Sequence, residues 1–373
     1  MCDEFDWMID RYIVPFAFAL IVLGMLFLAI APIYERVLFG QNDFASFYVG
    51  AKLVGTPALY SRDSNMKLIA DTVGMNFVGT TYIRPPYYAS FLKPIALLPY
   101  LPAYILFQLT VVASIVWFVA RFRKDCPALP YLAVPFIPLY ITLQNGQDTP
   151  YLLALIGAFV LLYRQKRDFS AGLILAACTL KFHLFLFVPV VLVMKNRWRI
   201  ITGGVCGVAM LGLVGLLIAG SDSYRQWVSV LRDPWISPCP EGLPNIHGLA
   251  LSLHGGIAWE ILTAAVIGLI FVWCVRKTEN VEVLVAMAIV GGLLVSFHSG
   301  MSDDVLLLLA FVLAFKSTTD KFLRIVSATT LSPIPHLMVL VGSPLSIAVP
   351  VLLLVWFFRA AYLVNAAPKP TVI

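Results

Sequence analysis

The sequence is short of charged residues. Only 12% of its 373 residues are Asp, Glu, Lys or Arg, and 60% are hydrophobic, whereas soluble domains carry about 25% charged residues. Aromatic residues make up 13% and the mean hydropathy is +0.89. So much apolar surface excludes an intrinsically disordered chain and a water-soluble globular fold. The sequence therefore predicts a protein whose solvent is mostly lipid.

Cysteine is scarce and forms no metal-binding pattern. The six cysteines, none of them in a CxxC spacing, are Cys2, Cys126, Cys178, Cys206, Cys239 and Cys274. Only Cys239 falls in a predicted external loop, so neither a disulfide framework nor a zinc site has support. We expect no cofactor and no bound metal.

There is also no basic arm or stripe of the kind that binds nucleic acid. Lys and Arg number 26 against 20 Asp and Glu, but the basic residues form short clusters between apolar runs, as in the cytoplasmic loops of membrane proteins. These clusters fall in residues 121–124, 164–167, 195–199, 276–277 and 316–321. Simple alternation of helices places all five on one side, which we expect to be the cytoplasmic side of the plasma membrane.

The first residues lack the positive charge of a secretory signal. The apolar run over 13–33 follows acidic residues and is long enough to span a bilayer, so it predicts a retained first helix. Twelve spans are predicted, near residues 13–33, 103–120, 128–143, 149–163, 169–180, 182–194, 200–219, 256–275, 281–297, 304–316, 321–340 and 345–363. The predicted fold class is an all-α polytopic membrane protein with a single domain over residues 1–373.

Two long segments fall on the opposite, external side. Residues 34–102 contain two stretches, 43–54 and 64–75, whose apolar spacing predicts interfacial helices. The proline-rich tail over 86–99 is too short to span comfortably and predicts a re-entrant or shallow helix. The second external segment covers residues 220–255.

Asp43 lies in the first external segment and is flanked by the aromatic residues Phe44, Phe47 and Tyr48. Aspartate before an amphipathic stretch is a favoured helix N-cap. The same carboxylate could also act as a general base that deprotonates an acceptor hydroxyl. Position alone leaves both roles open.

Polar groups at membrane depth are costly, so each needs a partner or a function. Lys181 and His183 lie at a turn between two short apolar stretches. Lysine there either snorkels to the surface or pairs with an anion such as phosphate. His298 precedes Asp303 and Asp304, which suit the positive end of a helix dipole, whereas the histidine could donate to a phosphate or relay a proton.

Amide and imidazole side chains recur on the predicted external side. Asn145 and Gln147 lie in a glycine turn, and Asn245 and His247 lie in the second external segment. A capped turn explains the first pair. Amides also bind sugar hydroxyls without adding charge, so these residues could line a carbohydrate pocket.

Six short motifs along the chain form a set. They read DFASFYVGA, RPPYYASFLKPIALLP, NGQ, AGLILAACTLKFH, RWR and NIHGLALSL. The set resembles glycosyltransferase family 87, which has the membrane-embedded C-type glycosyltransferase fold and includes the polyprenol-phosphate-mannose-dependent mannosyltransferases of mycobacteria. The resemblance implies transfer of a mannose-like sugar from a polyprenyl phosphate to a lipid or glycan acceptor on the extracytoplasmic face. It also implies that Asp43 is the catalytic aspartate.

The hypothesis that follows is an inverting single displacement. Asp43 would accept the proton of the acceptor hydroxyl, while Lys181, His298 and Arg84 stabilise the leaving phosphate. One carboxylate suffices for this reaction, unlike the paired carboxylates of glycoside hydrolysis.

Two alternatives come from other classes. A proton-coupled transporter or lipid-linked sugar flippase would use His298, Asp303 and Asp304 as a gate, but it needs ionisable groups on both sides of the membrane. A non-catalytic partner subunit would tolerate replacement of Asp43.

Overall fold

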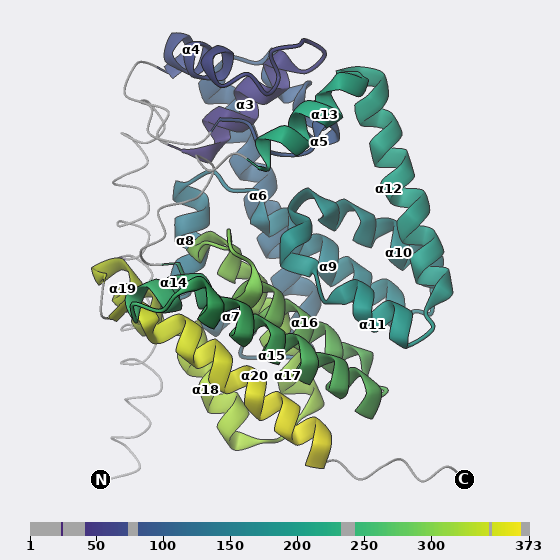
Figure 1. The fold of residues 1–373 in the computed structure, drawn as a ribbon, viewed down its shortest axis with the longest axis vertical. Helices are drawn as coiled ribbons and strands as arrows, with labels where there is room; N and C mark the ends of the chain where they lie inside the picture. The colour runs from purple at the N-terminus through teal and green to yellow at the C-terminus, as the bar shows by residue number, and fades with distance from the viewer. Residues whose placement is uncertain (1–23, 25–41, 74–80, 233–242, 343–344, 367–373) are drawn as a thin grey trace, which may run out of the picture.

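The computed structural model describes residues 24, 42–73, 81–232, 243–342 and 345–366. Every regular element within these residues is helical (Figure 1). The first predicted span, over 13–33, lies almost wholly outside the described residues.

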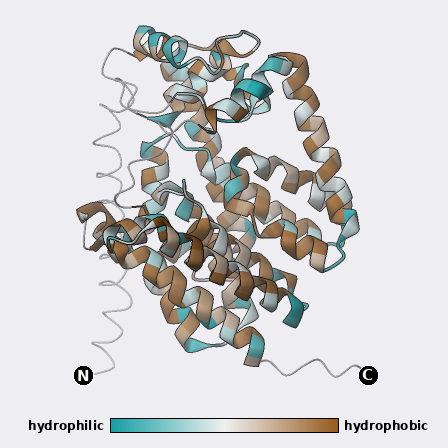
Figure 2. Ribbon diagram, viewed as in Figure 1, coloured by the Kyte–Doolittle hydropathy of each residue, from teal (hydrophilic) through white to brown (hydrophobic). Residues whose placement is uncertain are grey.

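Within the described residues, five helices are long and apolar enough to cross a membrane. They are α6 (Tyr100–Phe122), α10 (Asp168–Ala176) continued by η3 (Ala177–Phe185), α12 (Trp198–Ala219), α15 (Ile257–Lys277), and η6 (Leu345–Ile347) continued by α20 (Ala348–Ala366). The bent pair formed by α18 (Lys321–Leu331) and α19 (Pro333–Val341) could be a sixth crossing, with 50° between its halves. The brown, hydrophobic colouring of these helices in Figure 2 agrees with a lipid environment.

The expectation of twelve crossings is not confirmed, because several predicted spans are short or broken helices. The helices between and around the long ones are α7 (Leu129–Ala133), α8 (Ile137–Gln144), α9 (Thr149–Arg164), α11 (Val188–Met194), α14 (Ile246–Ser252), α16 (Val281–Val295), η5 (Met301–Leu306) and α17 (Leu307–Ser317). Proline explains several of the breaks, since Pro130, Pro138 and Pro189 each lie in the first turn of a short helix. Proline lacks an N–H and starts helices far better than it continues them.

Four further helices gather at one end of the molecule (Figure 1). They are α3 (Asp43–Leu53), α4 (Arg62–Val73), α5 (Pro86–Leu92) and α13 (Ser221–Val230). The first two coincide with the helices predicted at 43–54 and 64–75. α5 and the following turn η2 (Ile95–Leu97) are too short to span, as predicted for 86–99.

Ion pairs close the opposite end, which we call the Arg164 end. The Arg164 guanidinium donates to both oxygens of Glu282, at 2.8 and 2.7 Å, and also to Asp125. Lys316 lies 3.4 Å from Glu282. α9 runs from Thr149 near Asp43 to Arg164, and its 16 residues separate the two ends by about 24 Å at 1.5 Å per residue.

The basic cluster over 195–199 also lies at the Arg164 end. The Lys195 ammonium lies 2.6 Å from a Glu279 oxygen, which ties the loop before α12 to the loop after α15. The loops that carry the five basic clusters are thereby linked to one another at the Arg164 end, as alternation of the helices predicted.

α10 and α12 approach each other more closely than ordinary helices. A Cβ on Gly172 would overlap the carbonyl oxygen of Ile200, and one on Gly203 would overlap that of Phe169. Glycine lets the two backbones meet. This contact holds the first turns of α10 and α12 together at the Arg164 end.

Candidate active site

Asp43 opens α3 but does not cap it. The N-cap is Asn42, whose side-chain oxygen accepts from the Ala45 N–H at 3.1 Å. The capping role considered for Asp43 is therefore wrong, because the preceding residue performs it. The Asp43 N–H donates to the Asn145 carbonyl oxygen at 2.8 Å, which fixes the start of α3 against the turn over 145–148.

Asp43, Gln147 and Lys181 form a hydrogen-bonded chain. The Gln147 amide nitrogen donates to Asp43 Oδ2, and Lys181 Nζ donates to Gln147 Oε1 at 3.1 Å. An ammonium has no acceptor, so the Gln147 oxygen must face Lys181 and its NH2 must face Asp43. Within the described residues the second Asp43 oxygen has no hydrogen-bond partner.

Lys181 is enclosed by acceptors. Its ammonium lies 2.7 Å from Asp303, 2.8 Å from Thr149 and 3.1 Å from Asp148, besides the bond to Gln147, and its side chain is 3% exposed. A backbone kink at Lys181, with φ −129° and ψ 61° inside η3, places the side chain there. Three N–H groups meet four acceptors, so none is free for a phosphate.

Arg84 has donors to spare. Its Nε lies 2.8 Å and its Nη2 3.1 Å from the two oxygens of Asp148, a bidentate pair, and the guanidinium covers the Phe47 ring at 5.4 Å. Two of the five guanidinium N–H groups serve this pair, so three remain without an acceptor among the described residues. The side chain is 11% exposed, enough for contact with a ligand at the site.

The charges of Asp43 and of the four charged side chains around it nearly balance. Arg84 and Lys181 neutralise Asp148 and Asp303, and Asp43 supplies the one excess negative charge. Burial raises the pKa of the Asp43 carboxyl above its ordinary value, and the two cations offset part of that rise. A raised pKa makes Asp43 a stronger base than an exposed aspartate.

Three histidines form a row beside this group. His183 follows Lys181 by two residues, and its ring centre lies 6.5 Å from that of His298. His298 is exposed as a whole residue. Its pKa is lowered, first by the partial burial of its imidazole ring and second by the nearby His247. Phe297 connects the row, with its ring 5.2 Å from His298 and 3.9 Å from His247.

The predicted site residues of the second external segment, Asn245 and His247, hold neighbouring parts of the protein. The Asn245 oxygen caps α14 by accepting from the Gly248 N–H at 2.9 Å, while its amide nitrogen donates to the carbonyl oxygens of Ser296 and Ser299. It thus holds the loop that carries His298. His247 Nδ1 lies 2.9 Å from Glu260, so both Asn245 and His247 are already bonded within the protein.

Sequence reasoning missed the partners of the predicted residues. Asp148, which follows Gln147 in the glycine turn, was given no partner, although it binds Arg84 and Lys181. Thr149 and Glu260 were not singled out. A lone glutamate at the start of an apolar run was the available signal for Glu260. The described residues contain no group of three or more His, Cys, Asp or Glu placed to hold a metal ion.

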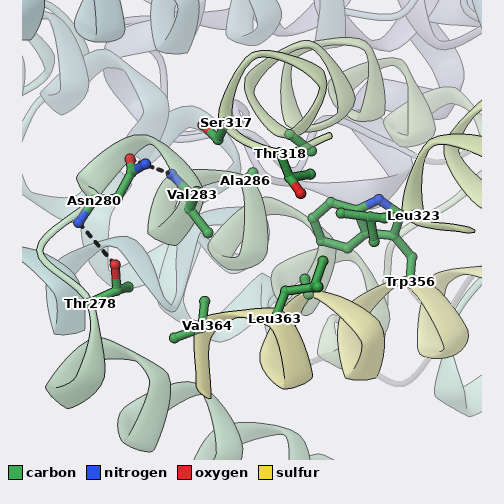
Figure 3. Close-up of a pocket in the computed structure, with 12 residues that line it drawn as sticks. Thr278, Asn280, Val283, Ala286, Ser317, Thr318, Leu323, Trp356, Leu363 and Val364 are labelled. Atoms are coloured by element: carbon green, nitrogen blue, oxygen red, sulfur yellow. Dashed lines mark hydrogen bonds between the residues drawn. The ribbon is translucent and has the colours of Figure 1, made fainter. Parts of the chain in front are cut away.

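A cavity of about 280 Å³ lies far from this chemistry, between α16, α17, α18 and α20 (Figure 3). Thr278, Thr318 and Trp356 are among its lining residues, and none of its lining side chains is ionisable. It lies at the Arg164 end, since α16 starts there and finishes near His298. This cavity therefore has no part in the site around Asp43.

The comparisons with known proteins agree with the sequence motifs. The model of glycosyltransferase family 87 matches residues 82–300, more than half of the chain. The match includes Arg84, Gln147, Lys181 and His298 and begins after Asp43. No curated protein and no solved structure matches the chain. The chain belongs to glycosyltransferase family 87.

Proposed function

We propose that this glycosyltransferase moves a mannose-like sugar from a polyprenyl phosphate to a lipid or glycan acceptor, with Asp43 as the general base. Family membership gives the reaction class. The membrane-spanning helices favour a lipid-linked donor, because a chain with 60% hydrophobic residues is built to meet its substrate in lipid. The site would lie at the extracytoplasmic face of the plasma membrane, opposite the basic clusters of the Arg164 end.

The geometry of Asp43 carries the proposal. Gln147 holds one carboxylate oxygen, and the other has no hydrogen-bond partner among the described residues. The free oxygen would accept the proton of the acceptor hydroxyl as its oxygen bonds to the anomeric carbon. The bond between that carbon and the phosphate oxygen breaks on the opposite face, and the phosphate keeps the electron pair. The product has inverted anomeric configuration.

Arg84 and His298 are the groups best placed to bind the donor phosphate. Arg84 retains three N–H groups that no described residue accepts from after it pairs with Asp148, and His298 is exposed. Donors that tighten on the leaving phosphate lower the barrier, because negative charge grows there in the transition state. Lys181, a phosphate ligand in the sequence-based hypothesis, is assigned a different role here: its N–H groups hold Gln147 and the carboxylates.

The sugar and the acceptor would lie between Asp43 and the histidine row. Gln147 and His183 border this space directly, since Gln147 bonds Asp43 and the His183 ring lies edge-on to that of His298. Asn145 supports it through its backbone carbonyl, which accepts from the Asp43 N–H. Asn245 and His247 shape it indirectly by holding the loop of His298. The transporter alternative gains nothing from the family match.

The test is transfer by purified protein in lipid nanodiscs, with radiolabelled polyprenyl-phosphate mannose as donor and a membrane extract as acceptor. Asp43→Asn should lower the transfer rate by at least about 100-fold, the usual effect of removing a general base. Asp63→Asn is the matched control, because Asp63 is an exposed aspartate in the first turn of the neighbouring helix α4. Full activity of Asp43→Asn would refute the role of Asp43 as base.

A further inference from the structure

A hollow of about 440 Å³ lies at the Arg164 end, where α10 and α12 begin. Three cationic side chains line it, those of Lys166, Arg167 and Arg199, against the one acidic side chain of Asp168. Lys166, Arg167 and Arg199 are all exposed, so their charges are available to a ligand. The excess of positive charge selects an anion.

The backbone adds donors to the same hollow. Residues Asp168 and Ser170 lie in the first turn of α10, and Arg199 lies in the first turn of α12. The first N–H groups of a helix have no carbonyl partner within the helix. Neither N-cap, Arg167 nor Arg197, forms a side-chain capping bond. Because α10 and α12 start at the same end, the positive ends of both helix dipoles meet here.

Apolar surface continues from the hollow along α12. Phe169 lines the hollow and is 46% exposed, and Trp198 is 58% exposed at the first residue of α12. Thr202 also lines the hollow, and Val205, one turn further along the same face, is 64% exposed. α12 qualifies as a membrane span with only 22% of its apolar window buried, so this face meets lipid chains.

We propose that this hollow binds the phosphate of an anionic glycerophospholipid whose acyl chains lie along the exposed face of α12. The cations, the free N–H groups and the Ser170 hydroxyl bind the phosphate, and Trp198 marks the level of the headgroups. The Thr202 hydroxyl donates to the Trp198 carbonyl oxygen at 2.9 Å, so Thr202 lines the hollow without donating to the phosphate. A soluble anion would use the charges but leave the apolar continuation unexplained. This site is separate from that of Asp43 and does not depend on the proposed reaction.

The basic cluster after α6 provides a matched control. Arg121 and Arg123 are exposed, lie at the same end of the molecule and carry the same charge as Arg167 and Arg199. They lie at the C-terminus of a helix, however, where the carbonyl groups disfavour an anion. A diffuse attraction to anionic lipid would involve both pairs equally, whereas a built site involves only the pair at α10 and α12.

The experiment measures phosphatidylglycerol retained by the full-length protein in native mass spectrometry, with phosphatidylcholine as reference lipid. We expect the double variant Arg167→Gln/Arg199→Gln to bind phosphatidylglycerol about 30-fold more weakly, since each cation near a lipid surface contributes about fivefold. The double variant Arg121→Gln/Arg123→Gln should retain the lipid like the unmodified protein.

A second variant tests the hollow without removing any cationic side chain. Thr202→Glu places a negative charge at the rim of the hollow on an exposed position, and it should also abolish retention. Equal loss in both double variants, or retention in Thr202→Glu, would overturn the proposal. So would an equal rise in melting temperature with glycerol 3-phosphate and with phosphatidylglycerol, which would identify a soluble anion instead.

Discussion

Replacing Lys181 with methionine separates two roles for this residue, ligand of the donor phosphate and holder of the Asp43 carboxylate, the proposed base. The change removes the ammonium that bonds Gln147, Asp148 and Asp303 while keeping most of the apolar stem. The Gln147 amide then loses the contact that orients it toward Asp43. If Lys181 acts through Gln147, the variant changes kcat and the pH profile rather than the affinity for the donor.

The size of the pH effect follows from the geometry. Two hydrogen bonds of about 3 Å each and one amide group separate Lys181 from Asp43 by at most about 8 Å. At an effective dielectric constant of about 20, this separation corresponds to about 2 kcal/mol, or more than one pKa unit. Burial raises the pKa of Asp43, and Arg84 and Lys181 lower it. Loss of Lys181 therefore raises the pKa of Asp43 further, and the acid limb of kcat moves up by at least about one pH unit.

The assay is the steady-state rate of sugar transfer at varied donor concentration between about pH 5 and pH 8. Lys181→Arg keeps the charge and should leave the acid limb in place. Removal of one member of a buried ion pair also costs about 3 kcal/mol in stability, so melting of both variants is followed in parallel. A rise in donor KM with unchanged kcat and an unchanged acid limb would refute the positioning role.

Three smaller changes test other parts of the structure. Gly203→Ala should lower the free energy of unfolding by about 3 kcal/mol, because the added Cβ would overlap the Phe169 carbonyl oxygen. Gly212→Ala is the control: it lies in the same helix, no atom lies within 4 Å of the added Cβ, and it should not lower the free energy of unfolding. Asn42→Ala should cost about 1 kcal/mol through loss of the α3 cap, measured by thermal unfolding. His298→Ala should raise the donor KM by at least about tenfold, as expected for loss of a hydrogen bond to a charged group, measured in the transfer assay.

Each of these three predictions would be contradicted by a specific result. Equal stability of the two glycine variants would contradict the close approach of α10 and α12. An unchanged melting temperature of Asn42→Ala would contradict the capping role of Asn42. A lower kcat at constant KM in His298→Ala would move His298 from phosphate binding to another step.

The sequence could predict which polar residues matter better than it could predict their partners. Asp43, Gln147 and Lys181 stood out as polar groups at or just below the predicted external surface, and the structure brings all three together. The ion pairs that fix them join residues far apart in the chain: Arg84 and Asp148 are 64 positions apart. Helical spacing contains no information about such long-range pairs, so a lysine that looked free to bind an anion is already neutralised.

The hydropathy pattern also could not predict the number of membrane crossings. Hydropathy detects apolar runs, but it cannot tell one long helix from two short ones that meet at an angle. Ser332 separates α18 from α19, which were predicted as one span over 321–340 and are bent by 50°. Local rules worked where they depend on neighbouring residues, as for the helices predicted at 43–54 and 64–75. They fail where the packing of distant helices decides the geometry.

The continuous helix formed by α10 and η3 sets the depth of the proposed reaction centre. It starts beside the hollow at Asp168 and reaches Lys181 after about 24 Å, counting about 1.5 Å per α-helical and 2.0 Å per 3-10 residue. That length is somewhat less than the roughly 30 Å hydrocarbon thickness of a bilayer. The ammonium of Lys181, and with it Asp43, thus keeps a constant height above the opposite leaflet. If Asp43 is the base, as proposed, bilayer thickness decides whether sugar and base meet at the water boundary or below it.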